Sequence, residues 1–198
     1  MSIRLENVTK AYEGRIIFKN VDLSLEDGKR YCLFGPSGCG KTTLMRIIGG
    51  LTEADSGMII RDPGQTLAVH FQENRLIPWL TIEKNLLTVM NRDTMTELLN
   101  RVELTDILHQ YPDELSGGMK RRISLARALG ADSNIILLDE PLRELDEEMI
   151  RKMIVLIREK TEEKMLVMVT HDREQAELVG CEILDMNRLE IKRTSMIK

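Results

Sequence analysis

The octapeptide GPSGCGKT at residues 35–42 limits what this chain can fold into more than any other feature. It follows a short apolar run, RYCLF, and leads into TTLMRIIGG, where the apolar residues have helical spacing until two glycines end the pattern. A glycine-rich loop between a strand and a helix lets successive backbone N–H groups converge on phosphate oxygens. The alternative is an ordinary glycine turn, but the complete G-x-x-x-x-G-K-T spacing in this context predicts a nucleotide-binding loop.

Individual residues of this loop are predicted to contact different parts of a nucleotide. Lys41 is expected to place a positive charge at the β- and γ-phosphates, and Thr42 to offer its hydroxyl to Mg²⁺. Thr43 can reach a further phosphate oxygen. The set expected to bind the nucleotide here is Gly35, Pro36, Ser37, Gly38, Cys39, Gly40, Lys41, Thr42 and Thr43.

Composition narrows the class of protein further. The chain has 198 residues, of which 42% are hydrophobic, enough for one substantial core with at most a smaller appended lobe. The net charge is −4 and the basic residues are scattered, which argues against a nucleic-acid-binding surface. The three cysteines form no C-x-x-C pair, as expected for reduced thiols in the cytoplasm. No apolar run is long enough to cross a bilayer, so we expect a soluble chain that reaches a membrane only through a partner.

Strand patterns occur on both sides of the glycine loop. Apolar residues alternate in two bursts within residues 2–26, on either side of residues 12–14, which predicts a strand, a turn and a strand with one buried face. Consecutive aliphatic residues at 67–71, 135–138 and 165–170 predict parallel strands that are covered on both faces.

Helical patterns fill much of the rest of the chain. Residues 81–90 and 94–102 predict an inserted helical arm, the second helix opening with a capping box of Thr94 and Glu97. Further helices are expected at 118–129, 145–160 and 172–178, and a hairpin turning at 186–188 is expected near the end. The patterns predict an α/β fold: a mostly parallel sheet with an N-terminal antiparallel β-subdomain and an inserted helical arm.

Polar residues follow each of the three buried strands. IILLDE places Asp139 and Glu140 at the end of one strand, where Asp139 is expected to hold Mg²⁺ through its water shell and Glu140 to deprotonate an attacking water. Gln72 can touch Mg²⁺ and the water, and His171 can bond the γ-phosphate. Each alone is more often a loop residue, but the carboxyl ends of parallel strands meet at one sheet edge, where such folds bind their ligands.

A second glycine turn, LSGGMKRR, raises the question of why one chain needs two phosphate-facing loops. Ser116, Gly117 and Gly118 open a predicted helix, so backbone N–H groups and a hydroxyl can hold a γ-phosphate there. At the tip of the arm this turn does not easily reach the chain's own nucleotide. We therefore predict a head-to-tail dimer in which each glycine turn closes over the ATP of the other copy.

The order and spacing of these motifs resemble the ATP-binding cassette (ABC) ATPases across essentially the whole chain. The resemblance implies a P-loop NTPase core and a dimer with two ATP molecules at its interface. It implies one ABC domain over residues 1–198, with the β-subdomain starting at 1–28, the core at 29–72 and 130–198, and the helical subdomain at 73–129. It also matches Tyr12 to an aromatic that stacks on adenine, the alternative being a strand-end tyrosine, and Asp146 to an aspartate that links the two sites.

A narrower resemblance lies in FQENRLIPWLTIEKN, residues 71–85, together with Met119 after the LSGG turn. It is similar to the ATPase subunits of bacterial importers for nitrate, sulfonates and taurine. This implies transmembrane permease subunits as partners, indirectly an extracellular substrate-binding protein, and a peripheral position on the cytoplasmic face of the membrane. Trp79 then lies where a membrane subunit would dock, the alternative being a core position in the arm.

Two other functions fit parts of the sequence. A non-transport ABC protein acting on ribosomes or DNA usually carries two cassettes, a long coiled coil or a basic surface, and none is visible here. A P-loop phosphotransferase would not need the LSGG turn, and Glu140 with His171 points towards water as the acceptor. The leading hypothesis is therefore an ATP-hydrolysing energy subunit of an importer.

Three positions depart from the family's pattern. Arg143 and Glu144 stand where small residues are usual, and Arg121 stands where glutamine is common. Charged side chains at a tight dimer seam can weaken closure or form new pairs across it.

Overall fold

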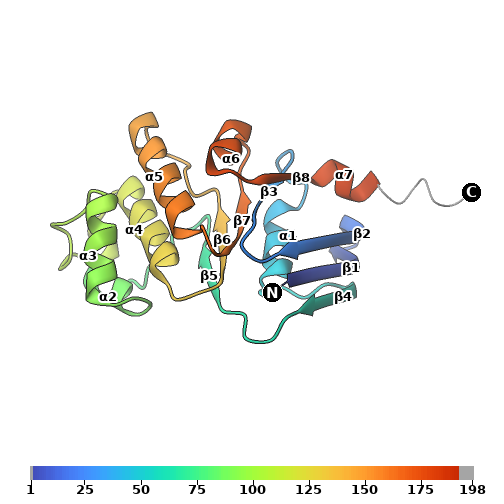
Figure 1. The fold of residues 1–198 in the computed structure, drawn as a ribbon, viewed down its shortest axis with the longest axis horizontal. Coiled ribbons are helices and arrows are strands. Elements are labelled where there is room, and N and C mark those ends of the chain that lie inside the picture. Colours follow the sequence, from blue (N-terminus) through green and yellow to red (C-terminus); the bar gives the residue numbers. More distant parts are fainter. Residues whose placement is uncertain (1, 192–198) are drawn as a thin grey trace, which may run out of the picture.

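Two β-sheets of different kinds organise residues 2–191, the part of the chain that the computed structural model describes (Figure 1). The smaller sheet is antiparallel, in the order β2-β1-β4, and consists of β1 (Ser2–Tyr12), β2 (Arg15–Glu26) and β4 (Ser56–Arg61). Glu13 and Gly14 both have positive φ, which suits the tight turn between two twisted strands. This confirms the predicted strand, turn and strand.

The larger sheet is parallel throughout, in the order β5-β6-β7-β3-β8. Its strands are β3 (Arg30–Phe34), β5 (Leu67–His70), β6 (Ile135–Asp139), β7 (Met165–Val169) and β8 (Glu182–Asp185). The three strands predicted from consecutive aliphatic residues lie at the predicted places, and every residue of β6 and β7 is buried. Burial on both faces explains why these strands show no polar alternation.

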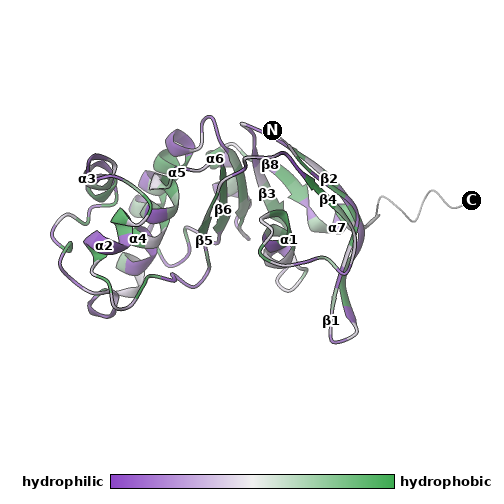
Figure 2. Ribbon diagram, turned by 90° about the horizontal axis from the view of Figure 1, so that it is seen from below, coloured by the Kyte–Doolittle hydropathy of each residue, from purple (hydrophilic) through white to green (hydrophobic). Residues whose placement is uncertain are grey.

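Alternate side chains of the parallel strands enter two separate cores. Ile135 and Leu137 of β6 face α1 (Lys41–Ile48) and the inner face of the antiparallel sheet. Ile136 and Leu138 face the other core, which helices cover. Figure 2 shows this layering: α1 lies between the two sheets, and α2–α5 lie on the opposite side of the parallel sheet. The glycine loop is thus held between β3 and α1, each of them packed in a core.

The helices on the second face begin at polar caps. They are α2 (Ile82–Leu87), α3 (Arg92–Arg101), α4 (Gly117–Gly130), α5 (Glu147–Lys160) and α6 (Arg173–Val179), with a 3-10 turn, η1 (Pro112–Glu114), before α4. Side-chain oxygens of Thr81, Asn91, Ser116, Asp146 and Asp172 accept backbone N–H groups of the first turns.

The predicted capping box of Thr94 and Glu97 is wrong. Asn91 caps α3 by accepting the N–H of Thr94 at 2.9 Å, so the helix begins at Arg92. Glu97 instead pairs with Lys160 of α5 at 2.7 Å. Asn91 is as good a cap as threonine, and it stands three residues earlier.

The predicted C-terminal hairpin is also wrong. β8 pairs in parallel with β3, and α7 (Met186–Ile191) follows it directly. Met186 is buried in the core beside α1, which turns the chain into a helix where a reversal was expected. β4 was not predicted, because its residues are mostly exposed and show no clear alternation. Within residues 2–191 no helix combines the length and apolarity that a membrane crossing requires.

Candidate functional site

A cleft of about 550 Å³ opens where the glycine loop meets the carboxyl ends of β6 and β7. Residues from four separate segments line it: Ser37, Gly38, Lys41, Thr42, Gln72, Asp139, Glu140, Arg143, Val169 and His171. A larger groove of about 840 Å³ lies between the end of α5 and the segment joining α2 to α3, and none of the residues predicted to bind a nucleotide or a metal, or to act in catalysis, lines it. The smaller cleft is therefore the candidate site.

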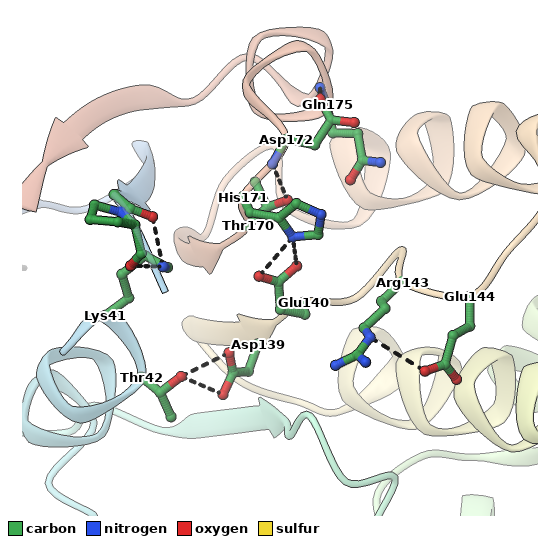
Figure 3. A network of polar contacts seen from close by, with 12 residues as sticks. Lys41, Thr42, Asp139, Glu140, Arg143, Glu144, Thr170, His171, Asp172 and Gln175 are labelled. Atoms are coloured by element: carbon green, nitrogen blue, oxygen red, sulfur yellow. Dashed lines mark hydrogen bonds and ion pairs between the residues drawn. The ribbon is translucent and has the colours of Figure 1, made fainter. Parts of the chain in front are cut away.

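The glycine loop owes its shape to two positions whose backbone conformation favours glycine. Gly38 and Gly40 have φ of 78° and 94°, and a Cβ on Gly40 would lie 2.5 Å from Cγ2 of Ile17. Lys41, nearly buried, folds back so that Nζ donates to the carbonyls of Gly35 and Pro36, each at 2.8 Å (Figure 3). The ammonium group is thereby held over the loop at the floor of the cleft.

Thr42 and Asp139 bring oxygen atoms together beside the loop. The hydroxyl of Thr42 lies 3.1 and 3.0 Å from the two carboxylate oxygens of Asp139, which is 1% exposed (Figure 3). Burial raises the pKa of Asp139, and nearby Glu140 raises it further, whereas the hydrogen bond from Thr42 lowers it. Hydroxyl and carboxylate oxygens are the ligands that Mg²⁺ prefers, so these two side chains fit the predicted metal position.

Glu140 and His171 form a pair across two neighbouring strand ends. Nδ1 of His171 lies 3.0 and 3.2 Å from the carboxylate oxygens of Glu140 (Figure 3). Because an ionised carboxylate can only accept, Nδ1 carries the proton in this contact. Glu140 has φ of 49°, unusual for a residue other than glycine, and its N–H donates to the carbonyl of Val169 at 2.9 Å. Strain of this kind is commonly found at functional sites.

Gln72 lies in the loop after β5 and lines the same cleft. Its backbone is held by Arg121 of α4, whose guanidinium donates to the carbonyl of Gln72 at 3.3 Å and to the carbonyl of Glu140 at 3.0 Å. Sequence reasoning noted Arg121 only as a departure from a pattern and did not assign it to the site. No local signal marked it, because its immediate sequence neighbours, Lys120 and Arg122, are also charged.

Five of the predicted binding residues lie outside both the glycine loop with its helix and the lining of this cleft. Tyr12 ends β1, is 46% exposed, and has the ammonium of Lys10 5.1 Å from its ring centroid. The other four lie at helix N-termini: Ser116, Gly117 and Gly118 at α4, and Asp146 at α5. Ser116 and Gly117 are exposed, and a Cβ on Gly117 would meet nothing within 4 Å. Within one copy, the second glycine turn therefore stands apart from the first.

The remaining loop residues are at the expected places. Gly35, Pro36, Cys39 and Gly40 belong to the loop without lining the cleft, and Cys39 is a free, half-buried cysteine. Thr43 is half-buried in the first turn of α1. A strand of a parallel sheet, followed by this glycine loop and then by a helix, defines a P-loop NTPase fold of the α/β class.

Comparison with known proteins places the chain within this class. Residues 18–143 match the family described as ABC transporter. The aliphatic sulfonates import ATP-binding protein of Pseudomonas syringae pv. tomato is 38% identical over 94% of this chain and 82% of its own length. The sulfate/thiosulfate import ATP-binding protein of Neisseria meningitidis serogroup A is 37% identical over 98% of this chain, which spans 61% of that relative.

Solved structures agree with the sequence relatives. A dimeric ATP-binding cassette in a post-hydrolysis state, bound to ADP and Pi, superposes with a TM-score of 0.82 at 31% identity, covering 92% of this chain and 93% of that one. A second dimeric structure of the same cassette, described as a bacterial ABC transporter cassette, gives a TM-score of 0.79 at 31% identity, covering 93% of this chain and 94% of that one. The chain belongs to the ABC transporter family.

Proposed function

We propose that this chain binds ATP with Mg²⁺ in the cleft and hydrolyses it. The observation that carries the proposal is that one cleft contains the ammonium of Lys41, the oxygens of Thr42 and Asp139, and the pair of Glu140 and His171. Each group has a task in phosphoryl transfer to water, in which catalysis is mainly positioning and charge stabilisation. The glycine loop supplies backbone N–H groups for the phosphates.

Each residue of the cleft has a proposed role. Lys41 neutralises the phosphates, and Thr42 and Asp139 would hold Mg²⁺, which offsets charge on the phosphate oxygens when bound. Glu140 accepts the proton of the attacking water, since its carboxylate is 16% exposed and faces the cleft. His171, 69% exposed, keeps that carboxylate oriented and presents its other ring nitrogen to the γ-phosphate. Gln72 completes the water and metal contacts from the loop after β5.

A second copy of the chain would complete each site. Ser116–Gly118 do not line their own cleft, yet they open the 14-residue helix α4, and Ser116 and Gly117 are exposed. A helix N-terminus binds anions through its backbone N–H groups and dipole. In a head-to-tail pair this turn would close over the γ-phosphate held by the partner, with Tyr12 on the adenine and Asp146 between the two sites.

The motion of closing and opening would drive a membrane importer for a small oxyanion or sulfonate. The relatives' names support this class of substrate, and Trp79 supports a docked permease subunit. Trp79 is 77% exposed, so the alternative that it belongs to the core of the arm is wrong. Trp79 lies in the loop between β5 and α2, the loop that also contains Gln72. In the same loop the guanidinium of Arg75 lies 4.0 Å from the ring centroid of Phe71. The chain would sit on the cytoplasmic face, with residues 73–129 as the coupling subdomain, and an extracellular binding protein would supply the solute.

Mixing two inactive variants tests the shared site. Lys41→Ala removes the positive charge that binds the phosphates in a chain's own cleft. Ser116→Arg blocks the glycine turn that closes over the cleft of the partner chain. Mixed in equal amounts, the two variants should recover ATP hydrolysis through heterodimers with at most one intact site, although each alone is inactive. Titrations that show no dependence on the partner chain would rule out the shared site. Steady hydrolysis with no added acceptor would rule out a phosphotransferase.

A further inference from the structure

Arg143 is a second fixed positive charge in the cleft. Among the described residues that line the cleft, Lys41 and Arg143 are the only lysine and arginine, opposite the carboxylates of Asp139 and Glu140. The backbone N–H of Arg143 donates to the carbonyl of Glu140 at 3.4 Å, so a tight turn starts at the proposed base and carries the guanidinium back to the cleft. The sequence analysis considered this residue only for its effect on closure of a dimer and gave it no role toward the nucleotide.

Arg143 forms an ion pair with Glu144 in this structure. Nε of Arg143 lies 3.3 Å from Oε1 of Glu144, and both side chains are about half exposed (Figure 3). The other carboxylate oxygen of Glu144 lies 3.9 Å from the buried guanidinium of Arg121. Glu144 has φ of 64°, so a residue with left-handed backbone lies at each end of the short turn. The carboxylate is shared between one guanidinium inside the protein and one in the cleft.

The charges in the cleft favour the transfer of Arg143 from Glu144 to a bound phosphate. Lys41 alone faces two carboxylates in the cleft, so without Arg143 their fixed charges sum to −1 before any anion arrives. Arginine binds phosphate through two parallel hydrogen bonds, whereas a half-exposed ion pair with carboxylate contributes little. Arg121 remains beside Glu144 after the exchange, so the carboxylate is not left alone.

We infer that Arg143 binds the terminal phosphate of ATP, and that Glu144 is its counter-ion when the cleft holds no nucleotide. The inference rests on the proposed ATP binding and adds a contact that distinguishes ATP from ADP. Arg143 lines the same cleft as Glu140, the group proposed to act at the γ-phosphate, and its backbone N–H donates to the carbonyl of Glu140, so ADP should gain little from its side chain. Arg121 acts as a positioning residue, because it fixes the carbonyl of Glu140 from which the turn begins.

Nucleotide affinity measured by titration calorimetry tests this directly. All chains carry Glu140→Gln and Ser116→Arg, so that neither hydrolysis nor pairing contributes to the measured Kd. Arg143→Gln should weaken ATP binding about tenfold and change ADP binding less than twofold. Arg143→Lys, which keeps the charge without the planar fork, should fall between. The matched control is Arg151→Gln, which breaks an ion pair with Glu147 of the same 3.3 Å length on the exposed face of α5. It should leave both affinities within twofold.

The Glu144→Gln variant should change ATP affinity in the opposite direction. Freed from its carboxylate, Arg143 should bind ATP a few-fold more tightly, and adding Arg143→Gln should abolish that gain. Unchanged ATP affinity in Arg143→Gln, or equal weakening of ATP and ADP, overturns the inference. Lys41→Ala is the reference for loss of a phosphate contact. If the parent chain binds no ATP, the proposed function fails; if it binds ATP and Arg143→Gln has no effect, only this inference fails.

Discussion

Arg121 should contribute to the stability of the whole chain because of where its hydrogen bonds go. Its side chain is 6% exposed, and it donates to the carbonyls of Gln72 and Glu140, which lie in loops 49 and 19 residues away in sequence. Replacing it with methionine keeps the length and the apolar stem but removes every donor. Both carbonyls then lose a charged hydrogen-bond partner.

The size of the effect can be worked out from these contacts. A buried carbonyl left without a donor costs about 1–3 kcal/mol, but the carbonyl of Glu140 keeps the N–H of Arg143 at 3.4 Å. Methionine also avoids the cost of burying a charge, and the contact with Glu144 at 3.9 Å is long. We expect Arg121→Met to lower the free energy of unfolding by about 2 kcal/mol, or the Tm by roughly 4–8 °C.

Urea unfolding followed by circular dichroism measures this free energy directly. Arg151→Met is the control: its ion pair with Glu147 is exposed, and its loss should cost less than about 0.5 kcal/mol. If Arg121→Met costs no more than the control, Arg121 does not hold the two loops.

Two pH-dependent predictions concern buried titratable groups. Burial lowers the pKa of His70 to about 3, helped by Arg121, so the unfolded chain takes up a proton below pH 6.5 that the folded chain excludes. Unfolding titrations should therefore show wild type losing about 1.4 kcal/mol per pH unit between pH 6 and 4 relative to His70→Gln, and parallel curves would refute this. Burial raises the pKa of Asp139 above its ordinary value of 3.8, so protonation of this side chain stabilises the folded chain. This stabilisation is complete below pH 3.8 and is lost as the pH rises through the raised pKa. Asp139→Asn should be more stable than wild type at pH 7 and should lose that advantage near pH 3.8; a less stable Asn variant at pH 7 would contradict the burial penalty.

The sequence predicted correctly those elements whose structure depends on residues close together in the chain. The glycine loop, the buried strands and the helices predicted at 118–129 and 145–160 each depend on a few neighbouring residues. Asp139, Glu140 and His171 were predicted to meet because parallel strands end at one edge, and the structure brings them to one cleft.

Contacts between distant segments escaped the sequence analysis. The hydrogen bonds of Arg121 join three segments, and no local pattern reports that the guanidinium is buried. β4 has mostly exposed residues, and its pairing with β1 is set by the antiparallel sheet, not by its own alternation. The segment after β8 looked like a turn, but burial of Met186 favours a helix there.

The most direct test of the shared nucleotide site is the mass of the Glu140→Gln chain in solution, measured by light scattering with and without ATP and Mg²⁺. Without its base the chain should bind ATP and stay closed, giving twice the monomer mass with ATP and the monomer mass without it. Adding Ser116→Arg should return the ATP-bound sample to the monomer mass. A Glu140→Gln chain that binds ATP yet remains monomeric at every concentration would contradict completion of the site by a second copy.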